Sequence, residues 1–229
     1  MIKAVLFDLD GTLLDRDLSV RRFIDKQYER LIKSLGHISK EKYSARFIEL
    51  DNHGFVWKDK VYQQLVDELE ITNIDWEDLL KDYLDEFKNS CVPFPNLLSM
   101  LEDLISSKFI LGIITNGYGQ FQMDNIKALG IENYFESILI SEWEGIKKPD
   151  PQIFRKALTE LNLEPSQSVF VGDHPLNDVK ASKNIGMVGI WKKDSRWDKV
   201  EADFIIDDLG ELPTLLKKCL ISKTFDSLR

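Results

Sequence analysis

Short apolar runs recur along the chain and predict buried β-strands. The first run extends from Ile2 to Phe7 and is followed directly by acidic residues. Stretches with the apolar spacing of an α-helix separate the runs, so the sequence predicts an α/β fold whose parallel sheet is covered on both faces. A frayed tail is expected from Ser222 onward. The predicted strands are 2–7, 109–114, 137–140, 168–171, 187–190 and 204–206, and the predicted helices are 96–108, 120–129, 151–161, 176–184 and 209–220.

One long segment near the N-terminus breaks this alternation. It is charged, rich in Lys, Glu, Leu and Tyr, and shows helical apolar spacing without clear strands. The triplet Asn52-His53-Gly54 predicts a turn between two of its helices. Pro93 and Pro95 mark the return to the α/β part of the chain. The predicted domains are an α/β domain formed by 1–14 and 93–229, and an all-helical insertion over 15–92.

Composition and charge narrow the class of protein. With 229 residues, 43% of them apolar and 30% charged, the chain has the composition of a soluble globular protein. A formal charge of -9 without a polybasic run argues against a nucleic acid polymer or an anionic membrane as partner. Cys91, Cys219 and the three histidines form no zinc-binding pattern, and the N-terminal segment resembles neither a signal peptide nor a membrane span. We therefore expect a cytoplasmic protein, either a monomer or a homodimer.

Two aspartates, Asp8 and Asp10, stand at the end of the first predicted strand. Side chains two positions apart on an extended strand point to the same side, so the two carboxylates would repel each other without a cation nearby. In an open parallel sheet, ligands collect beyond the carboxyl ends of the strands, where these two residues fall. An acidic turn punctuated by Gly11 is the simpler interpretation, but the pair favours a functional site.

Three later segments follow the ends of other predicted strands. Thr115 and Asn116 offer a hydroxyl and backbone N–H groups for phosphate oxygens, although such a pair also occurs in ordinary capping turns. Lys148 places an ammonium group just before a helix. A lysine at such a position is more usually a solvated surface residue than part of a site. Asp173 and Asp178 bring two further carboxylates to the same edge of the sheet. Oxygen ligands in this number suit Mg²⁺ and not Zn²⁺.

Taken in order along the chain, these four segments resemble the four signature motifs of the haloacid dehalogenase superfamily. The resemblance extends from Ile2 to about Leu216. The runs Lys148-Pro149-Asp150-Pro151 and Asn184-Ile185-Gly186-Met187 are typical of its helical-capped, phosphatase-like branch. The resemblance implies a Rossmann-like, doubly wound parallel sheet as the core, and it implies that the insertion over 15–92 is a helical cap domain. Pyrimidine nucleotidase-like and sugar-phosphate phosphatase members are the most similar.

The resemblance also implies an activity. It is that of a magnesium-dependent phosphohydrolase that removes phosphate from a small phosphorylated metabolite, of nucleotide or sugar phosphate type, through an aspartyl-phosphate intermediate. Asp8 would attack phosphorus, and Asp10, oriented by Thr12, would protonate the leaving oxygen and then activate water. The family pattern places the functional lysine directly before the proline, which favours Lys148 over Lys147. The implied phosphate ligands are Thr115, Asn116 and Lys148. The implied metal ligands are the side chain of Asp8, the backbone carbonyl oxygen of Asp10, Asp173 and Asp178, the last of these either binding the ion or lying beside it.

Other activities stay open at this point. The dehalogenases of the superfamily do not need a second carboxylate in the first motif, so Asp10 favours phosphoryl chemistry. Phosphonate-cleaving relatives need a cap lysine, and Lys58 and Lys60 are candidates for it. Lysines are so frequent in this segment that their presence is weak evidence for that activity. A phosphomutase shares every motif. Outside enzymes, the alternatives are a phospho-aspartate signalling module and a binding protein on the same scaffold, and the long insertion argues against the first.

One residue departs from the family pattern. His174 stands where a small hydroxyl residue is common, and we expect it to have a structural or solvent-facing role. Substrate specificity is expected to lie in the cap, but no single cap residue is assigned to it. The polar and aromatic candidates there are more often surface or core-edge residues on a charged helical bundle. They are Arg21, Arg22, Arg46, His53, Trp57 and Lys58.

Overall fold

The computed structural model describes residues 1–218, which divide into two compact units. One unit joins Met1–Asp15 to the chain from Pro93 onward, and we call it the α/β unit. The other is Arg16–Val92, which we call the helical unit. The end of the last predicted helix and the predicted tail lie outside the described residues. Within residues 1–218, no helix combines the length and the apolar character needed to cross a membrane.

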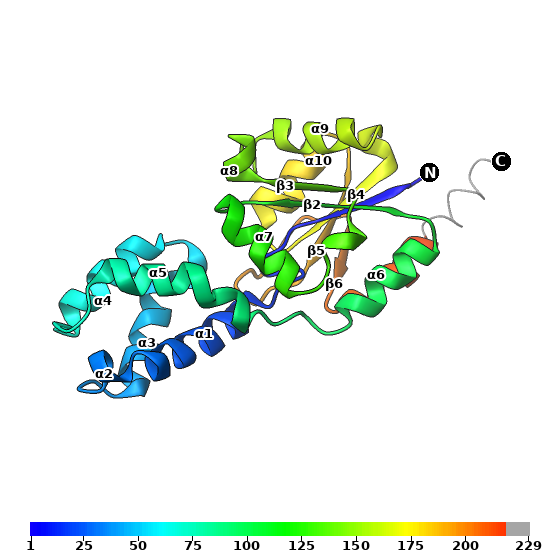
Figure 1. The fold of residues 1–229 in the computed structure, drawn as a ribbon. Helices are drawn as coiled ribbons and strands as arrows, with labels where there is room; N and C mark the ends of the chain where they lie inside the picture. Colours follow the sequence, from blue (N-terminus) through cyan, green and yellow to red (C-terminus); the bar gives the residue numbers. More distant parts are fainter. Residues whose placement is uncertain (219–229) are drawn as a thin grey trace, which may run out of the picture. The chain divides into compact units, whose positions relative to one another are not determined.

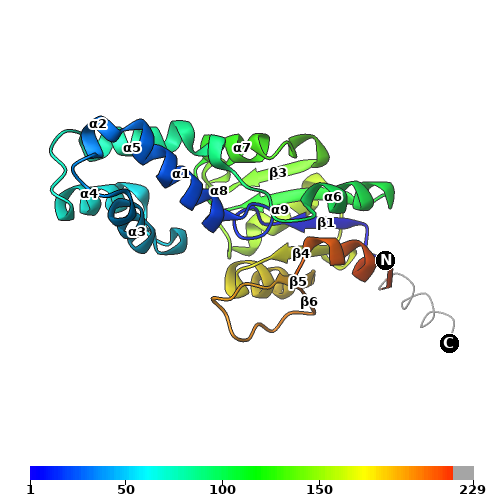
Figure 2. The ribbon, with the colours of Figure 1, turned by 90° about the horizontal axis from the view of Figure 1, so that it is seen from below.

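A six-stranded parallel sheet forms the centre of the α/β unit, in the order β3-β2-β1-β4-β5-β6. Figure 2 shows β3 on one side of β1, and β4, β5 and β6 on the other. All four residues of β1 are buried, as expected for a strand in a sheet covered on both faces. The structure therefore confirms the predicted α/β fold with its doubly wound sheet. The strands are β1 (Ala4–Phe7), β2 (Ile110–Thr115), β3 (Ser137–Ile140), β4 (Ser168–Gly172), β5 (Val188–Lys192) and β6 (Phe204–Ile206).

Helices lie on both sides of this sheet (Figure 1). Helices α9 and α10 lie above the strands in that view, and α6 and α7 lie below them. Phe154 of α9 packs edge-on against Phe170 of β4, with ring centroids 5.0 Å apart, in a cluster that also buries Leu6. The helical segments are α6 (Leu97–Ser106), α7 (Gly119–Ala128), η3 (Glu132–Tyr134), α8 (Ser141–Glu144), α9 (Pro151–Glu160), η4 (Pro165–Gln167), η5 (Pro175–Lys180), α10 (Ala181–Asn184), η6 (Leu209–Glu211) and a last helix over 212–218.

The chain leaves and re-enters the α/β unit at adjacent points. Leu14 forms an antiparallel bridge with Pro93. The next residue, Phe94, donates its N–H to the carbonyl oxygen of Leu13 at 3.0 Å. The structure groups Asp15 with the α/β unit, whereas the predicted insertion began at that residue. We call this pairing of the two chain segments the joint.

The helical unit is built around an aromatic core. Phe47 and Tyr62 lie with ring centroids 5.2 Å apart, and Phe23 and Tyr83 lie 5.0 Å apart. Gln27 is fully buried among them, and its side-chain oxygen accepts hydrogen bonds from two tyrosine hydroxyls at 2.9 Å. The segments of the unit are α1 (Arg16–Arg30), α2 (Ile32–Leu35), α3 (Lys40–Asp51), η1 (Asn52–Gly54), α4 (Lys58–Glu68), α5 (Trp76–Glu86) and η2 (Phe87–Ser90).

A buried ion cluster lies beside this core. Asp51 is 2% exposed and receives two hydrogen bonds from the Arg16 guanidinium, both of 2.9 Å. It also pairs with the Lys58 ammonium group. Burial alone would raise the pKa of Asp51, but Arg16 and Lys58 outweigh it and hold that pKa below its ordinary value. The charge of Asp51 is therefore well compensated.

Candidate active site

The turn after β1 carries the first two candidate residues. Asp8 follows the last strand residue, Phe7, and donates its N–H to the carbonyl oxygen of Val171 at 2.9 Å. Gly11 has a φ of 82°, a left-handed conformation that glycine adopts without strain. A Cβ atom at Gly11 would lie 2.6 Å from a carboxylate oxygen of Asp173. The glycine therefore lets the turn approach the end of β4 closely enough to bring the acids together.

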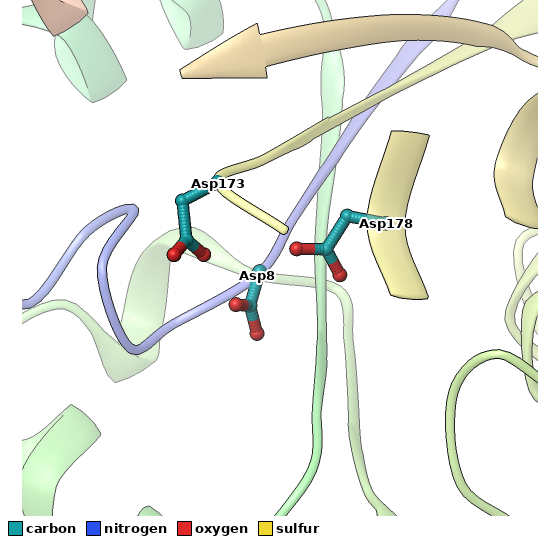
Figure 3. Close-up of side chains that lie close together, drawn as sticks. All are labelled: Asp8, Asp173 and Asp178. Carbon is teal, nitrogen blue, oxygen red and sulfur yellow. The ribbon is translucent and has the colours of Figure 1, made fainter. Parts of the chain in front are cut away.

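Three buried carboxylates meet at the carboxyl edge of the sheet (Figure 3). They belong to Asp8 after β1, Asp173 after β4 and Asp178 in η5, and one oxygen from each lies within 4.8 Å of the others. We call them the acid triad. Gly172 allows Asp178 to approach, because a Cβ there would lie 2.4 Å from the Asp178 Cβ. A cluster of this kind is stable only with compensating cations.

Lys148 supplies one of these cations. Its ammonium nitrogen lies 2.7 Å from Asp8 Oδ1 and 2.7 Å from Asp178 Oδ1, and the residue is 3% exposed. The Asn116 side chain fixes the backbone of Lys148: it donates to the Lys148 carbonyl oxygen and accepts from its N–H, both at 2.9 Å. Lys147 is exposed, so the structure separates the two lysines.

The acids and the lysine influence each other's protonation. Burial raises the pKa of Asp8 to about 6; Lys148 opposes that rise, and Asp178 adds to it. Burial and the charges of Asp8 and Asp178 raise the pKa of Asp173 well above its ordinary value. Burial acts to lower the pKa of Lys148, but Asp178 and Asp8 outweigh it, and the pKa lies above its ordinary value. Lys148 therefore stays charged, whereas ionisation of Asp8 and Asp173 is disfavoured.

A second group forms around Asp10. Its Oδ2 accepts a hydrogen bond of 2.7 Å from the Gln122 side chain, which also donates to the Thr115 hydroxyl at 2.8 Å. Thr12 was predicted to orient Asp10, and the structure does not support that role. The Thr12 hydroxyl is buried and has no hydrogen-bond partner among the described residues. Gln122, which the sequence did not single out, makes a side-chain contact with Asp10.

Two further contacts shape the acid triad. His174 caps the π-helical segment η5, because its Nδ1 accepts the N–H groups of Leu176 and Asn177 at 3.2 Å. Its own N–H donates to Asp178 Oδ2 at 2.9 Å. Arg196 donates to Asp173 Oδ2 at 2.7 Å from the loop after β5. Arg196 follows the end of a strand, at the edge of the sheet where ligands collect, and this position is the sequence feature that could have identified it.

The donor set of the triad fits a metal ion. Three carboxylates offer oxygen ligands within 4.8 Å of one another, and burial, together with the neighbouring carboxylates, raises the pKa values of Asp8 and Asp173. Hard divalent cations prefer oxygen ligands of this kind. The side chain of Asp10 is not part of the cluster, which leaves its backbone carbonyl as the predicted ligand. The described residues therefore contain a cluster that can hold a metal.

The fold and this cluster together define an α/β enzyme with an acidic site at the carboxyl edge of its sheet. Residues 5–191 match the haloacid dehalogenase-like hydrolases. The chain is 31% identical over 198 residues to the glyceraldehyde 3-phosphate phosphatase of Pyrococcus abyssi, covering 84% of this chain and 82% of that protein. The chain belongs to the haloacid dehalogenase-like hydrolase family.

Solved structures agree with this assignment. A HAD phosphatase from Thermococcus onnurineus matches with a TM-score of 0.66 and 28% identity, over 94% of this chain and 98% of that one. A 2-haloacid dehalogenase from Pseudomonas syringae matches with a TM-score of 0.64 and 27% identity, over 95% of this chain and 99% of that one. Similar folds thus carry two chemistries, and the residues of the site must distinguish them.

Proposed function

We propose that this protein is a magnesium-dependent phosphatase that acts on a small phosphorylated metabolite through an aspartyl-phosphate intermediate. The observation that carries the proposal is the acid triad, whose buried carboxylates need a bound cation before a phosphate dianion can approach. Asp10 adds a second carboxylate beside Thr115, which a proton transfer requires and a dehalogenation does not. Both features favour phosphoryl transfer over dehalogenation.

In the proposed reaction, Asp8 attacks phosphorus and the bond to the leaving oxygen breaks. Asp10 gives a proton to that oxygen, so the alcohol departs and Asp8 carries the phosphoryl group. Asp10 then takes a proton from water, which attacks the same phosphorus and regenerates Asp8 with release of phosphate. Lys148, the Thr115 hydroxyl and the Asn116 N–H bind the phosphoryl oxygens, where negative charge is spread in the transition state.

Mg²⁺ would be held by Asp8, the carbonyl oxygen of Asp10 and Asp173. When bound, it neutralises charge on the phosphoryl oxygens. Both oxygens of Asp178 already have partners, in Lys148 and the His174 N–H, which favours a place beside the ion for this residue. Arg196 pairs with one oxygen of Asp173, so the other oxygen would hold the ion.

The substrate is proposed to be a sugar phosphate or a nucleotide. The name of the Pyrococcus abyssi relative, a glyceraldehyde 3-phosphate phosphatase, favours a sugar phosphate. We propose that the helical unit serves as the cap that selects the organic part of the substrate. Its helices surround a core of their own, so they can present different surface residues without changing the chemistry of the α/β unit.

The proposal is tested by measuring phosphate release from sugar phosphates, nucleoside monophosphates and phosphoglycolate, with Mg²⁺ and with chelator. We expect release that requires Mg²⁺. Chloride release from a 2-haloacid is measured in parallel. Dehalogenation without phosphatase activity, or full phosphatase turnover in chelator, would contradict the proposal.

The two aspartates are separated by pre-steady-state kinetics on an aryl phosphate with a good leaving group. Such a substrate needs little help from an acid in the first step, but the second step still needs a base. Asp10→Ala is therefore expected to release up to about one equivalent of phenol per site and then stall, with phosphate attached at Asp8. Asp8→Ala should show no burst. Steady turnover by Asp10→Ala, or labelling at another residue, would contradict the assignment.

A further inference from the structure

Gln122 connects two groups of the proposed reaction. It lies on α7, is 2% exposed, and uses its side-chain nitrogen to donate to Asp10 Oδ2 at 2.7 Å and to the Thr115 hydroxyl at 2.8 Å. Its side-chain oxygen faces Asn125, whose Nδ2 lies 3.5 Å away. A buried amide is costly unless its donors are satisfied, and here the shortest contacts of the amide nitrogen are to residues of the site.

The chemistry of the partners fixes the orientation of this amide. An ionised carboxylate only accepts hydrogen bonds, so the nitrogen of Gln122, and not its oxygen, must face Asp10. The same nitrogen then donates to Thr115, whose oxygen acts as acceptor. The hydroxyl proton of Thr115 is thereby directed away from Gln122. In the structure it faces the Asn116 carbonyl oxygen, 3.5 Å from Thr115 Oγ1, and the proposed reaction brings a phosphoryl oxygen as an alternative acceptor.

The backbone before α7 is shaped to admit this side chain. Gly117 has a φ of 154°, and a Cβ atom there would lie 2.7 Å from Cγ of Gln122. The glycine of the Thr115-Asn116-Gly117 segment is therefore required where Gln122 crosses toward Asp10.

We propose that Gln122 is a positioning residue that holds the Asp10 carboxylate and the Thr115 hydroxyl in a fixed relation. By holding Oδ2 of Asp10 it fixes the orientation of the carboxyl group that transfers the proton to the leaving group, while Thr115 binds the phosphoryl group. This role rests on the proposed phosphatase function. It differs from that of Gln27, the buried glutamine of the helical unit. The Gln27 oxygen accepts from two tyrosine hydroxyls, and its nitrogen donates to a backbone carbonyl and to Asp82.

The test compares Gln122→Leu and the isosteric Gln122→Glu with the wild type on a series of phosphate monoesters, from activated aryl to alkyl. The measured quantity is kcat/KM, which reports transfer to Asp8 and not the later hydrolysis. We expect a loss of about 10²-fold or more on alkyl phosphates, where the acid is needed. On the most activated aryl phosphate we expect a loss of less than about tenfold. The dependence on the leaving group should therefore become steeper.

Gln120→Leu is the matched control, because Gln120 lies exposed on the same helix and donates to Asp124 at 2.7 Å. It should keep the wild-type dependence on the leaving group. Circular dichroism checks folding, and Gln122→Glu preserves the side-chain volume if Gln122→Leu fails to fold. An equal loss on all esters, or no loss, would overturn the role of Gln122 alone. An inactive wild type would instead overturn the phosphatase function, and this role with it.

Discussion

The two units of the molecule both bury ionised side chains, but they treat them in opposite ways. In the helical unit, Asp51 lies between Arg16 and Lys58, and its pKa is lowered. In the α/β unit, burial and the neighbouring carboxylates raise the pKa values of Asp8 and Asp173, and Lys148 and Arg196 only partly oppose the rise. The charge of Asp51 is compensated by side chains of the helical unit. In the proposed function, the acid triad would be compensated by a bound cation.

The difference indicates which cluster serves structure and which serves chemistry. Removing one partner from a compensated buried pair leaves an unpaired charge, so the helical cluster should matter mainly for stability. Clustered carboxylates with raised pKa values lower stability and occur preferentially at functional sites. Four predictions test this division, beginning with the largest expected effect.

Lys148→Ala should lower kcat/KM for phosphate release by about 10³-fold or more, because within residues 1–218 no other side-chain ammonium pairs with Asp8 to offset charge on the phosphoryl group. Lys147→Ala is the matched control and should retain nearly full activity, since Lys147 is exposed. The assay is run at saturating Mg²⁺ on protein shown to be folded. Equal, small effects of the two substitutions would contradict the proposed role of Lys148 in binding the phosphoryl group.

Asp51→Asn should lower the free energy of unfolding by about 3 kcal/mol, because Arg16 and Lys58 lose their buried counter-ion. Urea denaturation measures the change. The pH dependence has a definite sign: a lowered pKa stabilises the folded state above the ordinary pKa of aspartate and loses this effect as pH falls through the lowered value. A neutral result would show that the cluster does not support the helical unit.

The metal-free protein should lose stability as pH rises from about 4 to about 6. Asp8 binds a proton more tightly in the folded state than in the unfolded state, so the folded state gives up its advantage as pH passes the raised value of about 6. The loss should be on the order of 1–3 kcal/mol and should be smaller in Asp8→Asn, in which only the raised pKa of Asp173 remains. Urea denaturation in chelator across this pH range measures it. Identical pH profiles for the two proteins would contradict the raised pKa.

Glu68→Gln should leave the free energy of unfolding within experimental error. Arg46 donates to Glu68 at 2.8 Å, but both side chains lie at the surface of the helical unit. Exposed ion pairs of this kind contribute little, because water screens them and ordering the side chains costs entropy. A clear loss of unfolding free energy, measured by the same urea denaturation, would contradict the expected difference between buried and exposed ion pairs in this unit.

The sequence predicts the sheet well because its strands are short apolar runs with polar ends. The predicted strands 137–140 and 204–206 coincide with β3 and β6, and β2 is displaced by one residue. The segments carrying Asp8, Lys148 and Asp173 meet as expected from a rule of sheet topology, since carboxyl ends of parallel strands share one edge.

Contacts made by side chains on helices and loops could not be predicted from the sequence in this way. Gln122 is one polar residue on a helix, and nothing local shows that its side chain reaches back to Asp10. The six-residue π-helical segment that carries Asp178 also has no local sequence signal, and the sequence predicted an ordinary helix there. Asp51 is one acid among many in the charged segment, and only the packing of α1 and α3 against α4 gives it partners.

The joint at Leu14 and Pro93 has a consequence for the evolution of such a chain. The helical unit is a closed excursion, since its two ends meet at a backbone bridge and no strand of the sheet is interrupted. Doubling the length of an excursion of this kind costs only about 0.6 kcal/mol of loop-closure entropy. The insertion can therefore be lengthened, shortened or exchanged as a module, while the residues around Asp8 are inherited unchanged.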